Sequence, residues 1–291
     1  MASFLLSKPE IDYIVDGVNS NYRADGRTCK DYRHFNIQTG VVSNTSGSAK
    51  IQLDRTAAVV GVKAELGSPL PMSPGKGRLE FFIDCSALAS PEFENREGEE
   101  LGQHLARRLV EAYHNTSAID LSQLCVIPGQ QCWILYVDAL VLEWSGGVLD
   151  ALSMAVWAAL STTLIPKLTV TGEGEELEIE VSDNPHDSTK IDVSKAPVVV
   201  TLTQVGREYL VDASQEEEAC SSLRVAMGVD REGHVTSANK EGDGGIPYHK
   251  MNDIVTLGVD VGKQVFQRLD SLVQKQLSSD TMDTTEQTMF R

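Results

Sequence analysis

One segment limits the possible folds more than any other, because it predicts a helix with almost no polar surface. In residues 148–163, Leu152 and Val156 lie on a stripe with helical spacing, while Met154 and Trp157 place apolar side chains on other faces. A helix that is apolar nearly all round must be covered by other elements on several sides. We therefore expect this helix to lie inside a sizeable folded core.

Runs of apolar and β-branched residues upstream of this helix predict strands at 49–53, 57–64, 78–83 and 132–142. The residues before and between the first two strands are typical of tight connections, which favours a meander. Residues 67–77 contain three prolines and three glycines and predict a loop.

A change in hydrophobic period predicts a further helix between the third and fourth strands. In residues 98–113, Leu101, Leu105 and Leu109 recur at helical spacing. Several glutamates occupy the first turn, where acidic side chains interact favourably with the positive end of the helix dipole.

The composition shifts after the apolar helix. Residues 172–176 and 182–195 predict loops around one short strand at 177–181. Beyond Pro197, the pattern predicts strands and one long helix, at residues 198–205, 209–212, 223–229, 234–237 and 251–277.

This order of elements predicts a mixed α/β (α+β) fold made of two strand-helix halves. The expected divisions are an N-terminal extension at 1–22, a first half at 23–168, a linker with a short strand at 169–195, a second half at 196–277, and a flexible tail at 278–291.

The charge balance excludes one class of function. The chain has 25 Lys and Arg against 42 Asp and Glu, a formal net charge of −17. Phosphate binding depends on lysine and arginine side chains that release counterions, so a simple basic surface for nucleic acid is excluded. A local patch that contacts RNA stays possible.

Other sequence features set further expectations. No apolar stretch is long enough to span a membrane, and the first residues do not resemble a signal peptide. None of the five cysteines forms a C-x-x-C pair, so we expect neither a zinc site nor a disulfide framework.

Three local motifs become informative when they are taken together. They are Arg23-Ala24-Asp25-Gly26-Arg27 followed by Asp31-Tyr32-Arg33, residues 137–151 with Ser145-Gly146-Gly147, and Leu210-Val211-Asp212-Ala213 followed by Glu216-Glu217-Glu218-Ala219. Alone, each is an ordinary turn or solvated loop. In this order, from about Ser20 to Leu272, they resemble the RNase PH family, and more narrowly the non-catalytic ring subunits of the eukaryotic RNA exosome, which are related to the non-catalytic subunit of the archaeal ring. The resemblance implies an RNase PH-like fold with two halves of the ribosomal-protein-S5-like type.

RNase PH enzymes trim RNA from its 3′ end with inorganic phosphate as the nucleophile. Such chemistry requires carboxylates and a site that holds the anion. Asp138 matches the first family aspartate, but Leu140, on the same strand face, and Ser145 stand at the other two acidic positions. Leucine cannot bind a cation and serine is a poor substitute for a carboxylate. We therefore expect no catalytic residues, no bound metal and no cofactor.

The phosphate-binding loop of the family, of Gly-Thr-Arg type, also has no counterpart. By its place in the sequence it corresponds to residues 96–100, where three glutamates would repel phosphate. Arg107 matches an arginine that faces RNA in the archaeal non-catalytic subunit, while Gln103 stands at the other such position. Arg107 is thus a candidate RNA-binding residue, and Arg96 is a second one, on a loop that could line a pore. The alternative for Arg107 is a solvated side chain paired with an acid one turn earlier.

The resemblance also implies partners. They are other RNase PH-like subunits, arranged as three pairs in a six-membered ring, cap proteins of the S1/KH type, and RNA that passes through a central channel, with no membrane contact. The expected location is the nucleus, including the nucleolus, and the cytoplasm. Two alternatives stay open: an active phosphate-dependent 3′–5′ exoribonuclease that uses Asp138, Glu143 and Asp150, and an unrelated acidic adaptor, which would lack the second half.

Overall fold

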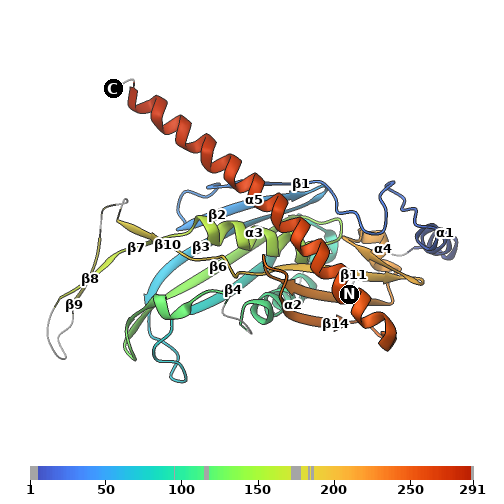
Figure 1. Ribbon diagram of the computed structural model, residues 1–291, viewed down its shortest axis with the longest axis horizontal. Coiled ribbons are helices and arrows are strands. Elements are labelled where there is room, and N and C mark those ends of the chain that lie inside the picture. Colours follow the sequence, from blue (N-terminus) through green and yellow to red (C-terminus); the bar gives the residue numbers. More distant parts are fainter. Residues whose placement is uncertain are drawn as a thin grey trace.

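The first half of the protein forms one broad 6-stranded sheet (Figure 1). The computed structural model describes residues 6–94, 96–114, 118–171, 178–182, 184 and 187–289. The strands lie in the order β1-β2-β3-β6-β4, with β5 paired to β6. Their bounds are Phe35–Thr39 for β1, Gly47–Leu53 for β2, Thr56–Gly67 for β3, Arg78–Cys85 for β4, Cys125–Ile127 for β5 and Gln131–Glu143 for β6.

The meander is confirmed, but it contains one more strand than predicted. β1, β2 and β3 pair antiparallel in sequence order. The sequence did not predict β1, which has only five residues. β4 does not continue the meander, because β6 pairs with β3 along nearly its whole length. β4 instead pairs parallel with the other side of β6, which the loop at 68–77 allows it to reach.

The second half forms a separate antiparallel sheet in the order β12-β11-β13-β14. The strands are β11 at Val198–Val205, β12 at Glu208–Val211, β13 at Leu223–Val229 and β14 at Val235–Glu241, and the short helix α4 at Gln215–Ala219 lies between β12 and β13 in the sequence. All four predicted strands are therefore present. The adaptor hypothesis required that this half be absent, and it is wrong.

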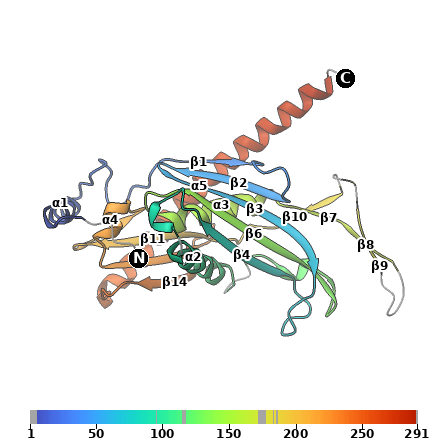
Figure 2. The same ribbon diagram turned by 180° about the vertical axis from the view of Figure 1, so that it is seen from behind.

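Helix α3, Val148–Thr162, lies at the centre of the molecule, as its apolar surface predicts. It packs on β2 and β3 from the first sheet and on β11 from the second. Helix α5, Met251–Met289, covers another side of α3. There the ring of Trp157 on α3 and the ring of Phe266 on α5 meet edge to face, with their centroids 5.7 Å apart. Figure 2 shows the first sheet from its other side, with α5 passing behind it. A single hydrophobic core therefore joins the two halves.

Helix α2, Arg96–His114, packs along β4 at the edge of the first sheet and also contacts β14. The buried side chains Leu105 and Leu109 confirm the predicted stripe. Helix α1, Lys8–Asn19, was not predicted. It begins with a capping box between Ser7 and Glu10, and its buried Val18 packs against Val205 in the second half.

The linker and the end of the predicted first half contain more structure than the one strand predicted there. β7 at Leu164–Pro166 pairs with β10 at Ser188–Lys190, and β8 at Leu168–Thr171 pairs with β9 at Glu178–Val181. Strands of three or four residues are too short to show a period, which explains why three of them were missed. The loop predicted at 172–176 lies outside the described residues.

Helix α5 continues to Met289 and so includes most of the tail at 278–291, whose flexibility stays a prediction. Residues 278–289 contain neither glycine nor proline, so no stop signal ends the helix at residue 277. Within the described ranges, no helix has both the length and the apolar character needed to cross a membrane.

Candidate functional site

The structure brings the three sequence motifs together around the side chain of Arg33. Its Nε and Nη2 donate to the two carboxylate oxygens of Asp212 at 2.9 and 2.7 Å. Its Nη1 donates to the carbonyl of Ser145 at 2.9 Å, and its Nη2 to that of Gly146 at 3.0 Å. One buried guanidinium thus links the N-terminal motif, the loop after β6 and the loop after β12.

A second buried ion pair strengthens the same junction. Arg23 donates from Nε and Nη2 to the carboxylate of Glu217 at 2.8 and 2.6 Å, and from Nη2 to the carbonyl of Asp212 at 2.8 Å. Glu217 also closes the capping box of α4 with Ser214. We call Arg23, Arg33, Asp212 and Glu217 the interhalf latch. Bidentate pairs of this kind fix geometry as well as charge.

The loop after β6 fits the latch so closely that two of its residues must be glycine. Gly146 and Gly147 have φ angles of 85° and 64°. A Cβ on Gly147 would lie 2.7 Å from the Asp212 Oδ1 and 2.8 Å from the Arg33 Nη2. The Gly147 N–H donates to the Glu218 carboxylate at 2.9 Å. The amide just before α3 is therefore occupied by a carboxylate of the chain itself.

Asp138 and Leu140 lie on the outer face of β6, as strand alternation predicted. On the neighbouring strand β4, Phe82 is the partner of Asp138 and Asp84 is the partner of Leu140. Phe82 is 53% exposed and Leu140 is 38% exposed, so this face carries apolar side chains around Asp138. In the part of the chain that the structure describes, no three His, Cys, Asp or Glu side chains are placed to hold a metal ion. The residues present on this face do not fit a metal.

The alternative catalytic set of Asp138, Glu143 and Asp150 is not brought together. Asp150 is 0% exposed. Its carboxylate accepts hydrogen bonds from the Tyr32 hydroxyl, from Thr201 N at 3.0 Å and from Thr201 Oγ1 at 2.6 Å. Burial raises the pKa of Asp150 to about 7, against the lowering effect of these bonds. Asp150 thus anchors the N-terminal motif to β11, a role that sequence reasoning missed although Asp150 and Tyr32 both lie in the quoted motifs.

Residues 96–100 form the start of α2. Arg96 is the first residue of the helix and is not on a loop, which corrects the expectation for it. The side chains of Arg96 and of the glutamates at 97, 99 and 100 are all exposed. A Cβ on Gly98 would lie 2.5 Å from the carbonyl oxygen of Phe93, so the helix begins in close contact with the preceding turn. Exposed carboxylates at this helix start oppose the binding of an anion.

Arg107 projects from α2 into solvent. Its side chain is 78% exposed, and its Nε lies 3.4 Å from Glu111, one turn later rather than one turn earlier. Gln103, one turn before it, is also exposed. The neighbouring Arg108 is bound more firmly, since it donates to Glu111 at 2.8 Å and to Glu241 on β14 at 2.7 Å. Arg107 is therefore available to a ligand, whereas Arg108 joins two elements.

Comparisons with known proteins agree with this fold. The 3′ exoribonuclease family (RNase PH), domain 1, matches residues 31–166, and domain 2 of the same family matches residues 195–261. A Dictyostelium discoideum protein that carries the provisional name exosome complex exonuclease RRP42 is 31% identical, over 93% of this chain and 98% of its own. The exosome complex component Rrp42 of Methanopyrus kandleri is 32% identical, over 90% and 96%.

Two solved structures show the same arrangement. A chain of the Archaeoglobus fulgidus exosome with RNA bound to the active site has a TM-score of 0.77 and 28% identity, and the match covers 89% of this chain and 97% of that chain. A chain of an archaeal exosome core has a TM-score of 0.73 and 27% identity, with coverage of 90% and 96%.

Proposed function

The chain belongs to the RNase PH family, and from that membership we propose that it is a non-catalytic subunit of an RNA exosome ring. In this role it supports 3′–5′ processing and degradation of RNA by helping to form the central channel. The proposal has two parts. The place in a ring rests on the similarity to exosome components, and the lack of catalysis rests on the geometry of the site.

The lack of catalysis is supported mainly by the hydrogen bonds that the loop after β6 makes within the chain. In the family this loop presents a catalytic aspartate. Here Ser145 stands at that position, and the carbonyls of Ser145 and Gly146 accept hydrogen bonds from Arg33. Glu218 occupies the amide of Gly147. The loop therefore holds the two halves together and presents no carboxylate.

Phosphorolysis would place a phosphate dianion next to the RNA backbone, and a cation or hydrogen-bond donors must offset this charge. Asp138 on β6 and Asp84 on β4 are carboxylates on this outer face, but their neighbours Leu140 and Phe82 offer no ligand atoms, and the described residues include no third ligand placed to complete a metal site. The three glutamates at the start of α2 add negative charge. We infer that the site has neither the set of carboxylates nor the phosphate-binding loop that phosphorolysis needs. The proposed structural role requires no cofactor.

The partners of the proposal are other RNase PH-like subunits and cap proteins of the S1/KH type. RNA in the channel is the third partner, and the exposed Arg107 is the residue most available to its phosphates. Membership of an RNA exosome supports a location in the nucleus, with the nucleolus, and in the cytoplasm.

Native mass spectrometry tests the ring. The chain is purified alone and after co-expression with individual RNase PH-like proteins of its own organism. The proposal predicts a stable heteromer with at least one of them and a closed ring when the full set is present. A chain that stays monomeric with every such protein would contradict the ring, whatever its catalytic state.

A further inference from the structure

Two cavities adjoin each other and form one groove, and none of the latch residues lines either of them. The first has a volume of about 730 Å³, and it lies between the end of α2, the start of β4 and residues 118–123. The second has a volume of about 410 Å³ and extends along the linker strands β7, β8 and β10. Both are lined by Ile119, Asp120, Gln123 and Asp192, so one ligand can occupy both. We call them together the linker groove.

The linker groove has more positive than negative side chains, in contrast to the chain as a whole. Its basic residues are Lys76, Arg78, Lys167, Lys190 and Lys195, together with His114, and its acidic residues are Glu80, Asp120 and Asp192. The full chain has 25 Lys and Arg against 42 Asp and Glu. Such a local reversal of sign favours an acidic ligand.

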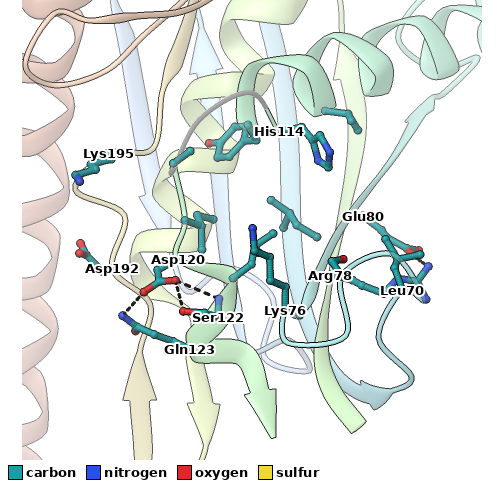
Figure 3. A pocket seen from close by; sticks show the side chains of 18 of the residues that line it. Leu70, Lys76, Arg78, Glu80, His114, Asp120, Ser122, Gln123, Asp192 and Lys195 are labelled. Carbon is teal, nitrogen blue, oxygen red and sulfur yellow. Dashed lines mark hydrogen bonds and ion pairs between the residues drawn. The ribbon is translucent and has the colours of Figure 1, made fainter. Parts of the chain in front are cut away.

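The acidic side chains of the groove are already engaged. Figure 3 shows the carboxylate of Asp120 bound to Ser122 and Gln123, at 2.5 and 3.1 Å. Asp192 accepts a hydrogen bond from the amide of Ser194 at 2.9 Å, and Glu80 pairs with Arg78.

The ammonium groups are free by comparison. Lys76 and Lys195 lie in electrostatic range of Asp120 and Asp192, whose pKa values are lowered first by these hydrogen bonds and only then by the lysines. Within the described residues, Lys76, Lys167, Lys190 and Lys195 make no side-chain hydrogen bond or ion pair. In Figure 3, Lys76 projects between Asp120 on one side and Arg78 on the other.

A buried polar group beside the same groove has no hydrogen-bond partner among the described residues. The hydroxyl of Tyr113 is inaccessible to solvent, and its residue is only 5% exposed. Burial raises the pKa of Tyr113, so the phenol stays neutral and can donate. A buried hydroxyl without a partner is unfavourable, but this one is closed off from the groove and makes no direct contact with a ligand there.

The two cavities differ in their lining. The first is lined mainly by polar side chains, and its Phe81 and Tyr113 rings are buried, whereas the second is lined mainly by aliphatic side chains. These aliphatic side chains include Leu124, Val126, Ile165, Leu168 and Ile191. RNA bases prefer to stack on aromatic rings. The only aromatic residue of this cavity among the described residues is Trp133, which is buried. Aliphatic walls suit aliphatic side chains instead, which favours a peptide over RNA.

We infer that the linker groove binds an extended segment of a partner protein in which acidic and aliphatic side chains alternate. The aliphatic side chains would pack on the walls of the second cavity, and the acidic ones would meet the free lysines. The unpaired edges of the two-stranded linker sheets offer additional main-chain hydrogen bonds. This interaction requires neither catalysis nor RNA.

A display library of random peptides of about ten residues, long enough in extended form to span both cavities, provides the test. It is selected on the full-length chain, and the enriched peptides are measured by fluorescence anisotropy. We expect acidic, aliphatic peptides whose Kd rises about tenfold in the double variant Lys76→Glu, Lys195→Glu, and whose binding weakens with salt. The matched control is Lys8→Glu, Lys30→Glu, which makes the same change of charge at exposed lysines outside the groove.

Tyr113→Phe is a second control. It removes only a hydroxyl that is closed off from the groove, so the protein should be at least as stable as before and its affinity for the peptides should not change. Enrichment of basic peptides, no enrichment, or peptides that bind equally well to the groove and control variants would overturn the inference. Labelled oligouridine that binds more tightly than any peptide and loses affinity in the same groove variant would instead identify an RNA site.

Discussion

Arg33 and Asp212 form a buried bidentate ion pair, 179 residues apart in sequence, that joins the start of the first half to the second. Asp212 accepts in addition from the backbone N–H of Arg33 at 2.8 Å. Asp212 has a φ angle of 49°, which is unusual for a residue other than glycine. The pair holds this conformation in place, and through it the orientation of the loop after β6.

The first prediction concerns the loss of this pair. Arg33→Met leaves the carboxylate of Asp212 buried and without its main partner, which should lower the free energy of unfolding by about 3–5 kcal/mol. Urea unfolding followed by fluorescence measures this change. The double variant Arg33→Met, Asp212→Asn should be less destabilised than the sum of the two single variants. Additive effects would show that the pair does not act as a unit.

The second prediction compares two glycines with positive φ. Gly147→Ala would place a Cβ within 3 Å of the latch, whereas Gly26, with a φ of 82°, has no atom within 4 Å of its Cβ position. Gly26→Ala should therefore cost only the left-handed backbone strain, about 1–2 kcal/mol, and Gly147→Ala clearly more. Thermal unfolding of both variants checks the order. Equal losses would mean that the loop can move away from Asp212.

The third prediction is a pH dependence caused by Asp150. Its pKa is raised from 3.8 to about 7 in the folded state. Between pH 3.8 and pH 7, Asp150 is therefore protonated in the folded protein and ionised in the unfolded one. The stabilising contribution is complete below the unfolded pKa and is lost as the pH rises through 7. Relative to Asp150→Asn, wild-type stability should fall between about pH 5 and pH 8, with a slope of at most about 1.4 kcal/mol per pH unit.

Burial also raises the pKa of Glu218. The comparison with Asp150→Asn separates the pH dependence caused by Asp150 from that caused by Glu218, because Glu218 is present in both proteins. Urea unfolding of both proteins at several pH values provides the data. A difference in stability that does not depend on pH would show that Asp150 is ionised in the folded protein throughout this range.

The fold was predictable where hydrophobic periods are long. Helix α3 and strands β6, β11 and β13 could be placed because their apolar residues are many and regular. The strands that neighbour β4 could not be predicted, because the order of strands in a sheet depends on contacts between residues distant in sequence. Likewise, alternation placed Asp138 and Leu140 on one face, but no local pattern shows that Asp150 is buried or that Arg33 reaches Asp212.

The fourth prediction distinguishes two adjacent arginines of α2. Arg107→Ala should leave the stability of the chain nearly unchanged, because the Arg107 side chain is exposed and makes one ion pair among the described residues, but it should weaken the retention of RNA by the assembled ring. Arg108→Ala should destabilise the chain, since Arg108 connects α2 to β14. Filter binding of the ring to oligouridine and thermal unfolding of the chain measure the two effects. RNA retention that is unchanged in the Arg107 variant would exclude Arg107 from the RNA path.

The central claim is that this polypeptide performs no phosphorolysis, and one assay addresses it most directly. Radiolabelled RNA is incubated with inorganic phosphate, magnesium and the pure chain, and the release of nucleoside diphosphates is followed with wild type and Asp138→Ala. We predict no phosphate-dependent release by either protein. Release by the wild type that Asp138→Ala abolishes would contradict the account.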